Sequence, residues 1–263
     1  IENKPGGGAT IGASLVASAA PDGYTVLYTT PGPQIINPYL MAKLPYDPDK
    51  DLIPVSRLAW FPNVLVVAPK LPVNTVQELI EYARKNPGKT NFGSAGIGAS
   101  SHLAGELFKS ISGVEITHVP YKGSGPANVA VVGGQVELGI SGTPGVMPHV
   151  RSGKLRIIAV TVPKRFKHLP DVPTIGESIP GYSGGAAGLS IFGTGGTPAP
   201  VIDRLNAAIK VALEDPDVIK FIEAGGNEAH YTSPEELGVL LAVEAKRWAD
   251  LKKATGLEIK QRR

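Results

Sequence analysis

The sequence predicts an α/β fold, in which a central sheet of mainly parallel strands is covered by helices on both faces. Two observations predict it. Short apolar strands and helical segments alternate through residues 90–161. This order is typical of βαβ units, whose strands run parallel. The flanking segments, 1–66 and 188–263, each lack enough strands for a complete sheet but could complete one together.

Each predicted element follows from its local pattern. Short apolar runs bounded by Gly, Pro or polar residues predict strands over 24–29, 63–68, 90–94, 115–119, 136–140, 155–161 and 188–193. Small-residue or amphipathic runs predict helices over 8–20, 76–85, 100–111, 125–133, 144–152, 199–214, 216–224 and 233–254. Thr75 or Asn74 is the expected cap of one helix, and Ser233 followed by Pro-Glu-Glu opens the last one. Two Pro-rich stretches, 30–51 and 164–182, have no clear period and are expected to be irregular.

Two lobes are predicted from this order. Residues 67–187 carry a sheet of their own and are expected to form an inserted lobe 2, while 1–66 and 188–263 form a discontinuous lobe 1. The chain then crosses twice, and the strands at 63–68 and 188–193 are the candidate crossings. Two lobes joined by two strands make a hinge, and a cleft between lobes is a common ligand site.

The composition excludes several classes of protein. The chain has 263 residues with 19% charged, 42% hydrophobic, a net charge of +3 and no cysteine. The small net charge and the lack of a basic block argue against a nucleic-acid partner. No apolar run reaches the ~20 residues of a membrane span. Without Cys there is no disulfide, thiolate chemistry or Cys-based zinc site. The chain opens at Ile1 without Met, and we expect that material upstream is absent from it.

The stretch from Asn91 to Ala127 is the most informative part of the chain. Twice, a short strand runs into a Gly/Ser loop that opens a helix, first at Gly96-Ile-Gly-Ala-Ser-Ser and then at Tyr121-Lys-Gly-Ser-Gly-Pro. A helix start offers free backbone N–H groups and the positive end of the helix dipole. Two such starts on neighbouring strands therefore predict a site for an acidic ligand.

Each candidate in these loops also has a structural reading. Ser100 or Ser101 could simply cap the helix that follows, and Lys122 could be a solvated surface residue. Ser141 and Thr143, at the end of a third strand, could donate to a ligand or cap the next helix. Thr29, Thr30 and Gln34, in the other lobe, could meet a ligand or belong to a loop shaped only by turn chemistry.

The sequence offers little machinery for catalysis. Gly96-Ile-Gly-Ala-Ser-Ser ends in Ser where a dinucleotide fingerprint has Gly, and the acid expected about 20 residues on would be Glu115, at the wrong end of a strand. The Gly98-Ala-Ser-Ser-His stretch lacks the final Gly of a nucleophile elbow. The five histidines show no metal spacing. We therefore predict no catalytic residue, no bound metal and no cofactor.

The chain resembles the periplasmic solute-binding proteins of tripartite tricarboxylate transporters, the Bug or TctC type. The matching stretches follow one another in order up to about Thr174: Glu2-Asn-Lys-Pro-Gly-Gly-Gly, Ala20-Pro-Asp-Gly-Tyr-Thr, Asn37-Pro, Leu44-Pro-Tyr-Asp-Pro, Ser94-Ala-Gly-Ile-Gly-Ala-Ser-Ser-His-Leu, His118-Val-Pro-Tyr-Lys-Gly-Ser-Gly-Pro-Ala, Gly153-Lys-Leu-Arg and Leu169-Pro-Asp-Val-Pro-Thr.

The resemblance implies a two-lobed type II periplasmic binding protein, each lobe a central sheet flanked by helices. It implies a monomer that closes on a small carboxylic acid and passes it to membrane transporter subunits, with no nucleic-acid partner. By the same resemblance, the ligand contacts fall on Thr29, Thr30, Gln34, Ser94, Ala95, Gly96, Gly98, Ser100, Ser101, Lys122, Gly123, Ser124, Ser141 and Thr143.

The chain departs from the family pattern in two respects. The family begins with a further strand, Gly-rich loop and helix, so we expect that the N-terminal strand of lobe 1 lies outside this sequence. The family also often has an acidic residue near the end of the third strand of the inserted lobe, where this chain has Ser141-Gly-Thr. Its absence favours a plain di- or monocarboxylate over an amino acid.

Two other functions stay open from the sequence. One is a nucleotide- or phosphate-ester-using enzyme built on the Gly96 loop, and the other is a signalling sensor of the same fold without a transporter partner.

Overall fold

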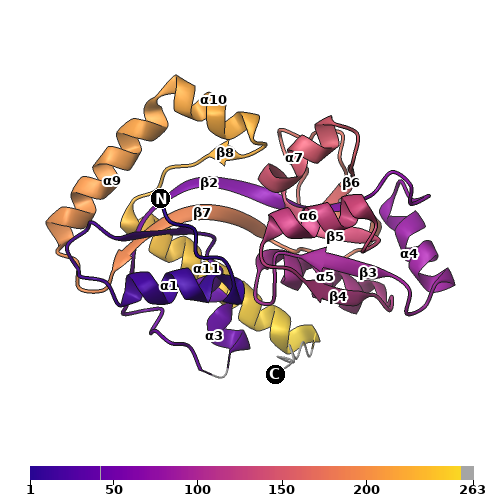
Figure 1. Cartoon of the computed structure of the whole chain (residues 1–263), viewed down its shortest axis with the longest axis horizontal. Helices are drawn as coiled ribbons and strands as arrows, with labels where there is room; N and C mark the ends of the chain where they lie inside the picture. The colour runs from indigo at the N-terminus through magenta and orange to yellow at the C-terminus, as the bar shows by residue number, and fades with distance from the viewer. Residues whose placement is uncertain (42, 256–263) are drawn as a thin grey trace. The chain divides into compact units, whose positions relative to one another are not determined.

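The computed structural model describes residues 1–41 and 43–255, and the chain divides into two compact units. Unit 1 comprises Ile1–Trp60 together with the chain from Gly188 onward, and unit 2 comprises Phe61–Ala187. The chain passes from one unit to the other inside strand β2 (Leu52–Val67) and inside strand β7 (Ala186–Thr194), which Figure 1 labels. In the part of the chain that the structure describes, no helix is both long and apolar enough to cross a lipid bilayer.

Unit 2 is built on a mixed sheet in the order β6-β2-β5-β3-β4. Its strands besides β2 are β3 (Asn91–Ser94), β4 (Thr117–Pro120), β5 (Leu138–Gly142) and β6 (Arg156–Val160). Strand β3 is parallel to β4 and to β5, as the alternating sequence predicts. Strand β2 runs antiparallel to both β5 and β6, which is a departure from an all-parallel sheet. No crossover helix joins β2 to either neighbour, so nothing forces it to be parallel.

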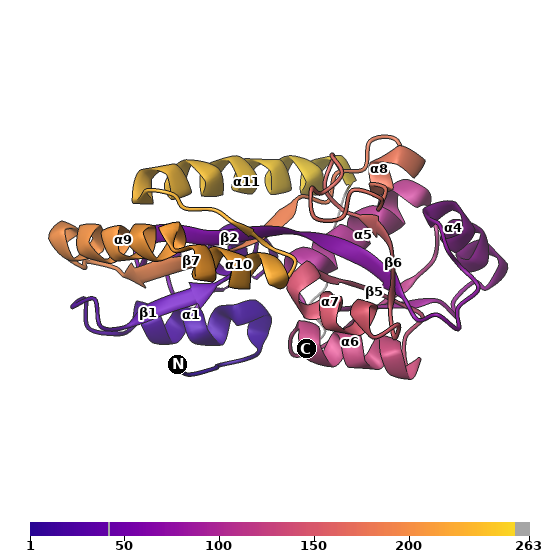
Figure 2. The same cartoon turned by 90° about the horizontal axis from the view of Figure 1, so that it is seen from above.

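Helices cover both faces of this sheet. Helix α5 (Ser100–Ser112) joins β3 to β4, and helix α6 (Ser124–Gly133) leads from β4 back past β3 to β5. The two crossovers run in opposite directions, so the right-handed rule puts their helices on opposite faces, as Figure 2 shows. Helix α7 (Thr143–Arg151) follows β5, and helix α4 (Val76–Lys85) precedes β3. Thr75 caps α4 by accepting the Glu78 N–H, which confirms one of the two expected caps.

The core of unit 2 is apolar and closely packed. Val64, Leu65, Val66 and Val67 of β2 are all fully buried, because this part of the strand has neighbours on both sides and helices over the sheet. Helix α5 packs on β3 where Gly105 faces Phe92, and a Cβ atom at Gly105 would lie 2.2 Å from the Phe92 ring.

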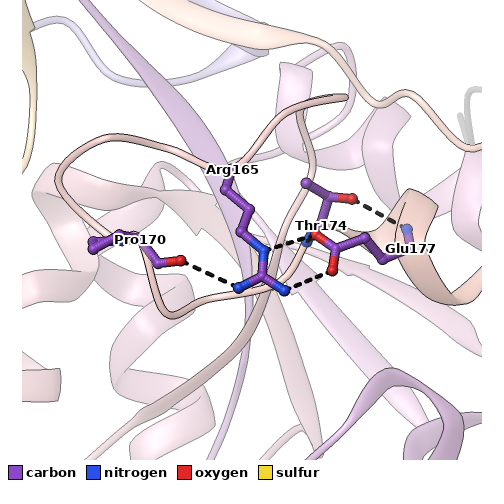
Figure 3. A network of polar contacts seen from close by, with 4 residues as sticks. All are labelled: Arg165, Pro170, Thr174 and Glu177. Carbon is purple, nitrogen blue, oxygen red and sulfur yellow. Dashed lines mark hydrogen bonds and ion pairs between the residues drawn. The ribbon is translucent and has the colours of Figure 1, made fainter.

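The Pro-rich segment 164–182 is irregular, as predicted, except for the short helix α8 (Ile175–Ser178). The guanidinium of Arg165 holds it together (Figure 3). Its Nε and Nη2 donate to the two oxygens of Glu177 at 2.9 and 2.7 Å, and its Nη1 donates to the Pro170 carbonyl at 3.3 Å. Thr174 caps α8 in a capping box with Glu177.

Unit 1 contains a second group of paired strands and the helices of the C-terminal part of the chain. Strand β1 (Val26–Thr29) pairs antiparallel with β7, β7 neighbours β2, and β2 pairs antiparallel with β8 (Glu228–Ala229). The helices at the C-terminal end are α9 (Ala199–Glu214), α10 (Pro216–Ala224) and α11 (Pro234–Thr255). Ser233 and Glu236 exchange hydrogen bonds at the start of α11, which confirms the predicted cap.

Three expectations for unit 1 are corrected. The helix predicted over 8–20 is a 3-10 turn η1 (Gly7–Ala9) followed by α1 (Thr10–Ala17), because Gly6 to Ala9 all have positive φ. The stretch 30–51 is not wholly irregular: it contains α2 (Gly32–Ile35) and α3 (Asn37–Leu40). Strand β2 is longer than the predicted run over 63–68 and begins at Leu52.

Candidate ligand-binding site

Two of the predicted loops of unit 2, those after β3 and β5, lie at the topological switch point of its sheet. The chain leaves β3 toward β4 on one side, and it leaves β5 toward β6 on the other side. Ligands of open α/β sheets bind in the crevice beyond the carboxyl ends of two such strands. The loops that follow Ser94 and Gly142 are therefore where this topology places a binding site.

The loop after β3 is held by its own side chains. Ser94 Oγ accepts the Gly96 N–H at 3.1 Å, Ser101 Oγ accepts the Ala95 N–H at 3.1 Å, and His102 Nδ1 accepts the Gly98 N–H at 3.3 Å. Three amides that the motif offers to a ligand therefore already have partners within the loop.

The loop after β4 docks on the loop after β3. The Tyr121 N–H donates to the Ser94 carbonyl and the Gly123 N–H donates to the Ala95 carbonyl, each at 3.1 Å. Gly96 is required at this contact, since its φ is +122° and a Cβ atom there would lie 2.9 Å from the Tyr121 carbonyl oxygen. The starts of α5 and α6 are thus tied together.

Four backbone amides at these two helix starts remain available. Within the described residues, the N–H groups of Ser100 and Ser101 in α5 and of Ser124 and Gly125 in α6 have no hydrogen-bond partner. Ser100 and Ser124 are half-buried, Gly125 is exposed, and Lys122 extends into solvent beside them. Ser100 Oγ accepts from the Asn63 side chain at 3.1 Å, which leaves its own proton to donate.

The alternative interpretation of the polar residues at this edge as helix caps is wrong. The N-cap residues are Ala99 for α5, Gly123 for α6 and Gly142 for α7, and none of them makes a side-chain capping bond. Ser100 and Ser101 instead bond to Asn63 and to the Ala95 amide. Because their side chains are used elsewhere, the first turn of α5 keeps its free N–H groups.

The end of β5 contributes buried hydroxyls. Ser141 and Thr143 are 1% and 0% exposed, and among the described residues Ser141 Oγ has no hydrogen-bond partner. Asn128 of α6 donates to the Gly145 carbonyl of α7 at 2.7 Å. A Cβ atom at Gly145 would lie within 3.8 Å of Asn128, Ser124 and Ser141, so the start of α7 adjoins the start of α6.

Three predicted residues belong to unit 1. Thr29 is buried at the end of β1 opposite Ser190 of β7, and Thr30 follows it. Gln34 lies in α2, and its two amide atoms are buried without a hydrogen-bond partner among the described residues. Asn37 donates to the Gly8 carbonyl at 3.0 Å, which joins the Gly-rich turn to this region.

Four further residues belong to this edge and were not predicted from the sequence: Asn63, Asn128, His102 and His118. Asn63 opens the apolar half of β2, and a polar residue that interrupts an apolar run was the only signal for it. His102 of α5 and His118 of β4 stack with ring centroids 4.0 Å apart and an interplanar angle of 19°. Only the tertiary structure brings these two rings together.

His102 and His118 also form a cluster with Glu106, in which their ligand atoms lie within 4.8 Å of one another. Metal ligands must direct their in-plane lone pairs at one point. The two stacked rings are nearly parallel, so their lone pairs cannot converge on one ion. Burial lowers the pKa of His102 to about 3 and that of His118 to about 4, which keeps both rings neutral near pH 7.

The fold and the site together define the class of α/β solute-binding proteins. The chain belongs to the tripartite tricarboxylate transporter family receptors, whose family model matches residues 1–257. Members of this family are periplasmic solute-binding receptors and not enzymes, which confirms the binding prediction and removes the nucleotide-using enzyme as an alternative.

Three solved structures show what the chain is similar to. It is 36% identical to "R. palustris Rpa4515 with adipate", with a TM-score of 0.94 over 98% of this chain and 86% of that one. It is 35% identical to "periplasmic binding protein BugD", with a TM-score of 0.92 over 98% and 87%. It is 33% identical to "MatC (Rpa3494) from Rhodopseudomonas palustris with bound malate", with a TM-score of 0.87 over 94% and 85%.

Proposed function

We propose that this protein captures a small organic carboxylate in the periplasm and delivers it, as a monomer, to membrane transporter subunits. The observation that carries the proposal is the pair of helix starts, α5 and α6, which among the described residues offer four N–H groups without a partner. Helix α5 begins at the switch point of the sheet, and the loop before α6 is hydrogen-bonded to the loop before α5.

The chemistry of these helix starts suits a carboxylate. The first-turn N–H groups carry the positive end of each helix dipole, so an anion is favoured there. Hydrogen bonds from N–H groups to an ionised acceptor contribute about 1.5–3 kcal/mol each. The Ser100 hydroxyl and the exposed Lys122 ammonium add two further donors to a negative group.

The similar structures support the same ligand class. Rpa4515 was solved with adipate and MatC with malate, and both ligands are dicarboxylates. The end of β5 carries Ser141-Gly142-Thr143 and no acidic side chain. Since no carboxylate stands there to pair with an ammonium group, we propose a plain mono- or dicarboxylate over an amino acid.

The contribution of unit 1 is part of the proposal. Residues 1–66 and 188–263 are proposed to act as one lobe and 67–187 as the other, with Thr29, Thr30 and Gln34 supplying contacts to the same ligand. The buried Gln34 amide, which has no hydrogen-bond partner in the part of the chain that the structure describes, supports this role for α2.

The proposal is tested by isothermal titration calorimetry against a panel of C4 to C6 dicarboxylates, aromatic monocarboxylates, amino acids and nucleotides. We expect saturable heat and a raised melting temperature with at least one carboxylate, and none with NAD or ATP. Absence of heat and of a thermal shift with every acid in the panel would overturn the proposal. Uptake of the bound acid by cells lacking the gene, with and without complementation, tests the delivery step.

A further inference from the structure

The stacked pair His102–His118 lies behind the loop that follows β3. His118 Nε2 is 2.7 Å from Ser94 Oγ, and Ser94 Oγ accepts the Gly96 N–H. His102 Nδ1 accepts the Gly98 N–H in a buried position. Each ring therefore holds one part of the same turn, and the stacking fixes the rings against each other.

The stack continues into the core. The ring of Phe92 lies 4.8 Å from the ring of His118 at an interplanar angle of 28°. Phe92 in turn packs against Gly105 of α5. The rings thus link the strands β3 and β4 to helix α5 directly below the turn.

We propose that His102 and His118 are positioning residues for the ligand, which hold residues 94–98 in the shape that aims the first turn of α5 at a carboxylate. The inference rests on the proposed function of that helix start. Neither ring is assigned a contact with the ligand.

The hydrogen bond from the Gly98 N–H fixes the protonation state of the His102 ring. A ring nitrogen that accepts a hydrogen bond carries no proton, so His102 must be neutral with its proton on Nε2. A second proton would sit on Nδ1 and face the Gly98 N–H, and the bond would be lost. The loop is therefore held only while His102 is neutral.

Two charged groups face the ring pair. Glu106 of α5 has a carboxylate oxygen within 4.8 Å of a nitrogen of each ring, and its charge favours protonation. Lys109 pairs with Glu106 at 3.7 Å and opposes protonation of both rings. Burial is the largest cause of the lowered pKa of both rings; His118 and then Lys109 add to it for His102, and Lys109 adds to it for His118. The pair therefore stays neutral through the range above about pH 5.

The test compares variants that keep the ring with variants that keep a hydrogen-bonding atom. His102→Phe preserves stacking but removes Nδ1, while His102→Asn places an amide atom near the Nδ1 position. His118→Phe and His118→Gln form the matching pair for Nε2. With the acid that the wild type binds, we expect roughly fivefold to tenfold weaker binding for each Phe variant, from the loss of about 1 kcal/mol, and partial recovery for Asn and Gln.

The outcomes separate this inference from the proposed function. If the wild type binds no acid, the proposed function fails. If the wild type binds the acid and both Phe variants bind it with the same affinity as the wild type, the positioning role is wrong. Nitrogen-15 NMR of the wild type near pH 7 provides a readout that does not depend on any variant folding. A neutral His102 with its proton on Nε2 supports the inference, and a proton on Nδ1 would overturn it.

Discussion

The backbone N–H of Gly98 donates a hydrogen bond to Nδ1 of His102, which lies four residues further along the chain. The amide is therefore used to shape the loop and is not free for a ligand. The amides left for a ligand lie in the first turns of α5 and α6, where Ser100, Ser101, Ser124 and Gly125 have no partner among the described residues.

The contact between the two loops depends on Gly96. Gly96→Ala puts a Cβ atom 2.9 Å from the Tyr121 carbonyl oxygen at a φ of +122°, so we expect a loss of about 1–3 kcal/mol in the free energy of unfolding. Urea denaturation measures it. Gly238→Ala, in α11 with no atom within 4 Å of the added Cβ, is the matched control and should raise stability by about 0.5–1 kcal/mol. Equal stability of wild type and Gly96→Ala would contradict the docking of the loops.

The unfolding free energy should fall on mild acidification. His102 and His118 have pKa values of about 3 and 4 in the folded protein against 6.5 in the unfolded chain, so the unfolded chain takes up protons first. Stability is then fully present above pH 6.5 and decreases below it. We expect a loss of about 2–3 kcal/mol between pH 6.5 and about pH 5.

The control for this pH dependence is the double variant His102→Phe/His118→Phe. His230, whose pKa is also lowered by burial, titrates in the same direction in both proteins. Urea unfolding at several pH values should therefore give a shallower decline for the double variant. An unchanged slope would show that the stacked pair does not stay neutral in the folded protein.

Arg165 should order its own segment without governing global stability. The side chains of Arg165 and Glu177 are 49% and 42% exposed, so Arg165→Ala is expected to leave the melting temperature nearly unchanged. Amide hydrogen exchange should become faster over residues 166–177, because the bonds to Glu177 and Pro170 are lost. Lys164→Ala, one residue away, is the control. Exchange rates that match in the two variants would argue against this role of Arg165.

Ligand binding should make the protein more compact if the two proposed lobes close. Small-angle X-ray scattering with and without a saturating carboxylate measures the radius of gyration. We expect it to decrease, and a non-binding amino acid is the control. An unchanged radius with a ligand that calorimetry shows to be bound would reject lobe closure while leaving the carboxylate site intact.

The sequence predicts most elements of this fold because their patterns are local. The bounds of α4, α9 and α10 agree with the predicted ranges, since amphipathic spacing and a cap at Thr75 are visible along the chain. The first half of β2 was missed because Pro54 and Arg57 interrupt its apolar pattern. The short helices α2 and α3 were missed because four residues are too few to show a period.

The site is less predictable than the fold because its contacts are tertiary. The motif around Gly96 correctly indicates a strand, a turn and a helix. It does not indicate that Ser101 and His102 take two of the amides, or that Asn63 reaches Ser100 from another strand. The spacing of His102 and His118 along the chain likewise gives no sign of their stacking.

The most direct test of the carboxylate site removes single N–H groups from the two helix starts. Ser100 and Ser124 are the first residues of α5 and α6, a position where Pro is accepted because its missing N–H breaks no helical bond. Calorimetry with the acid bound by the wild type is compared for Ser100→Pro and Ser124→Pro and for the controls Ser100→Ala and Ser124→Ala, which keep the N–H. We predict roughly tenfold to hundredfold weaker binding for each Pro variant, beyond the effect of its Ala control. Pro variants that fold and bind as tightly as their Ala controls would contradict the account.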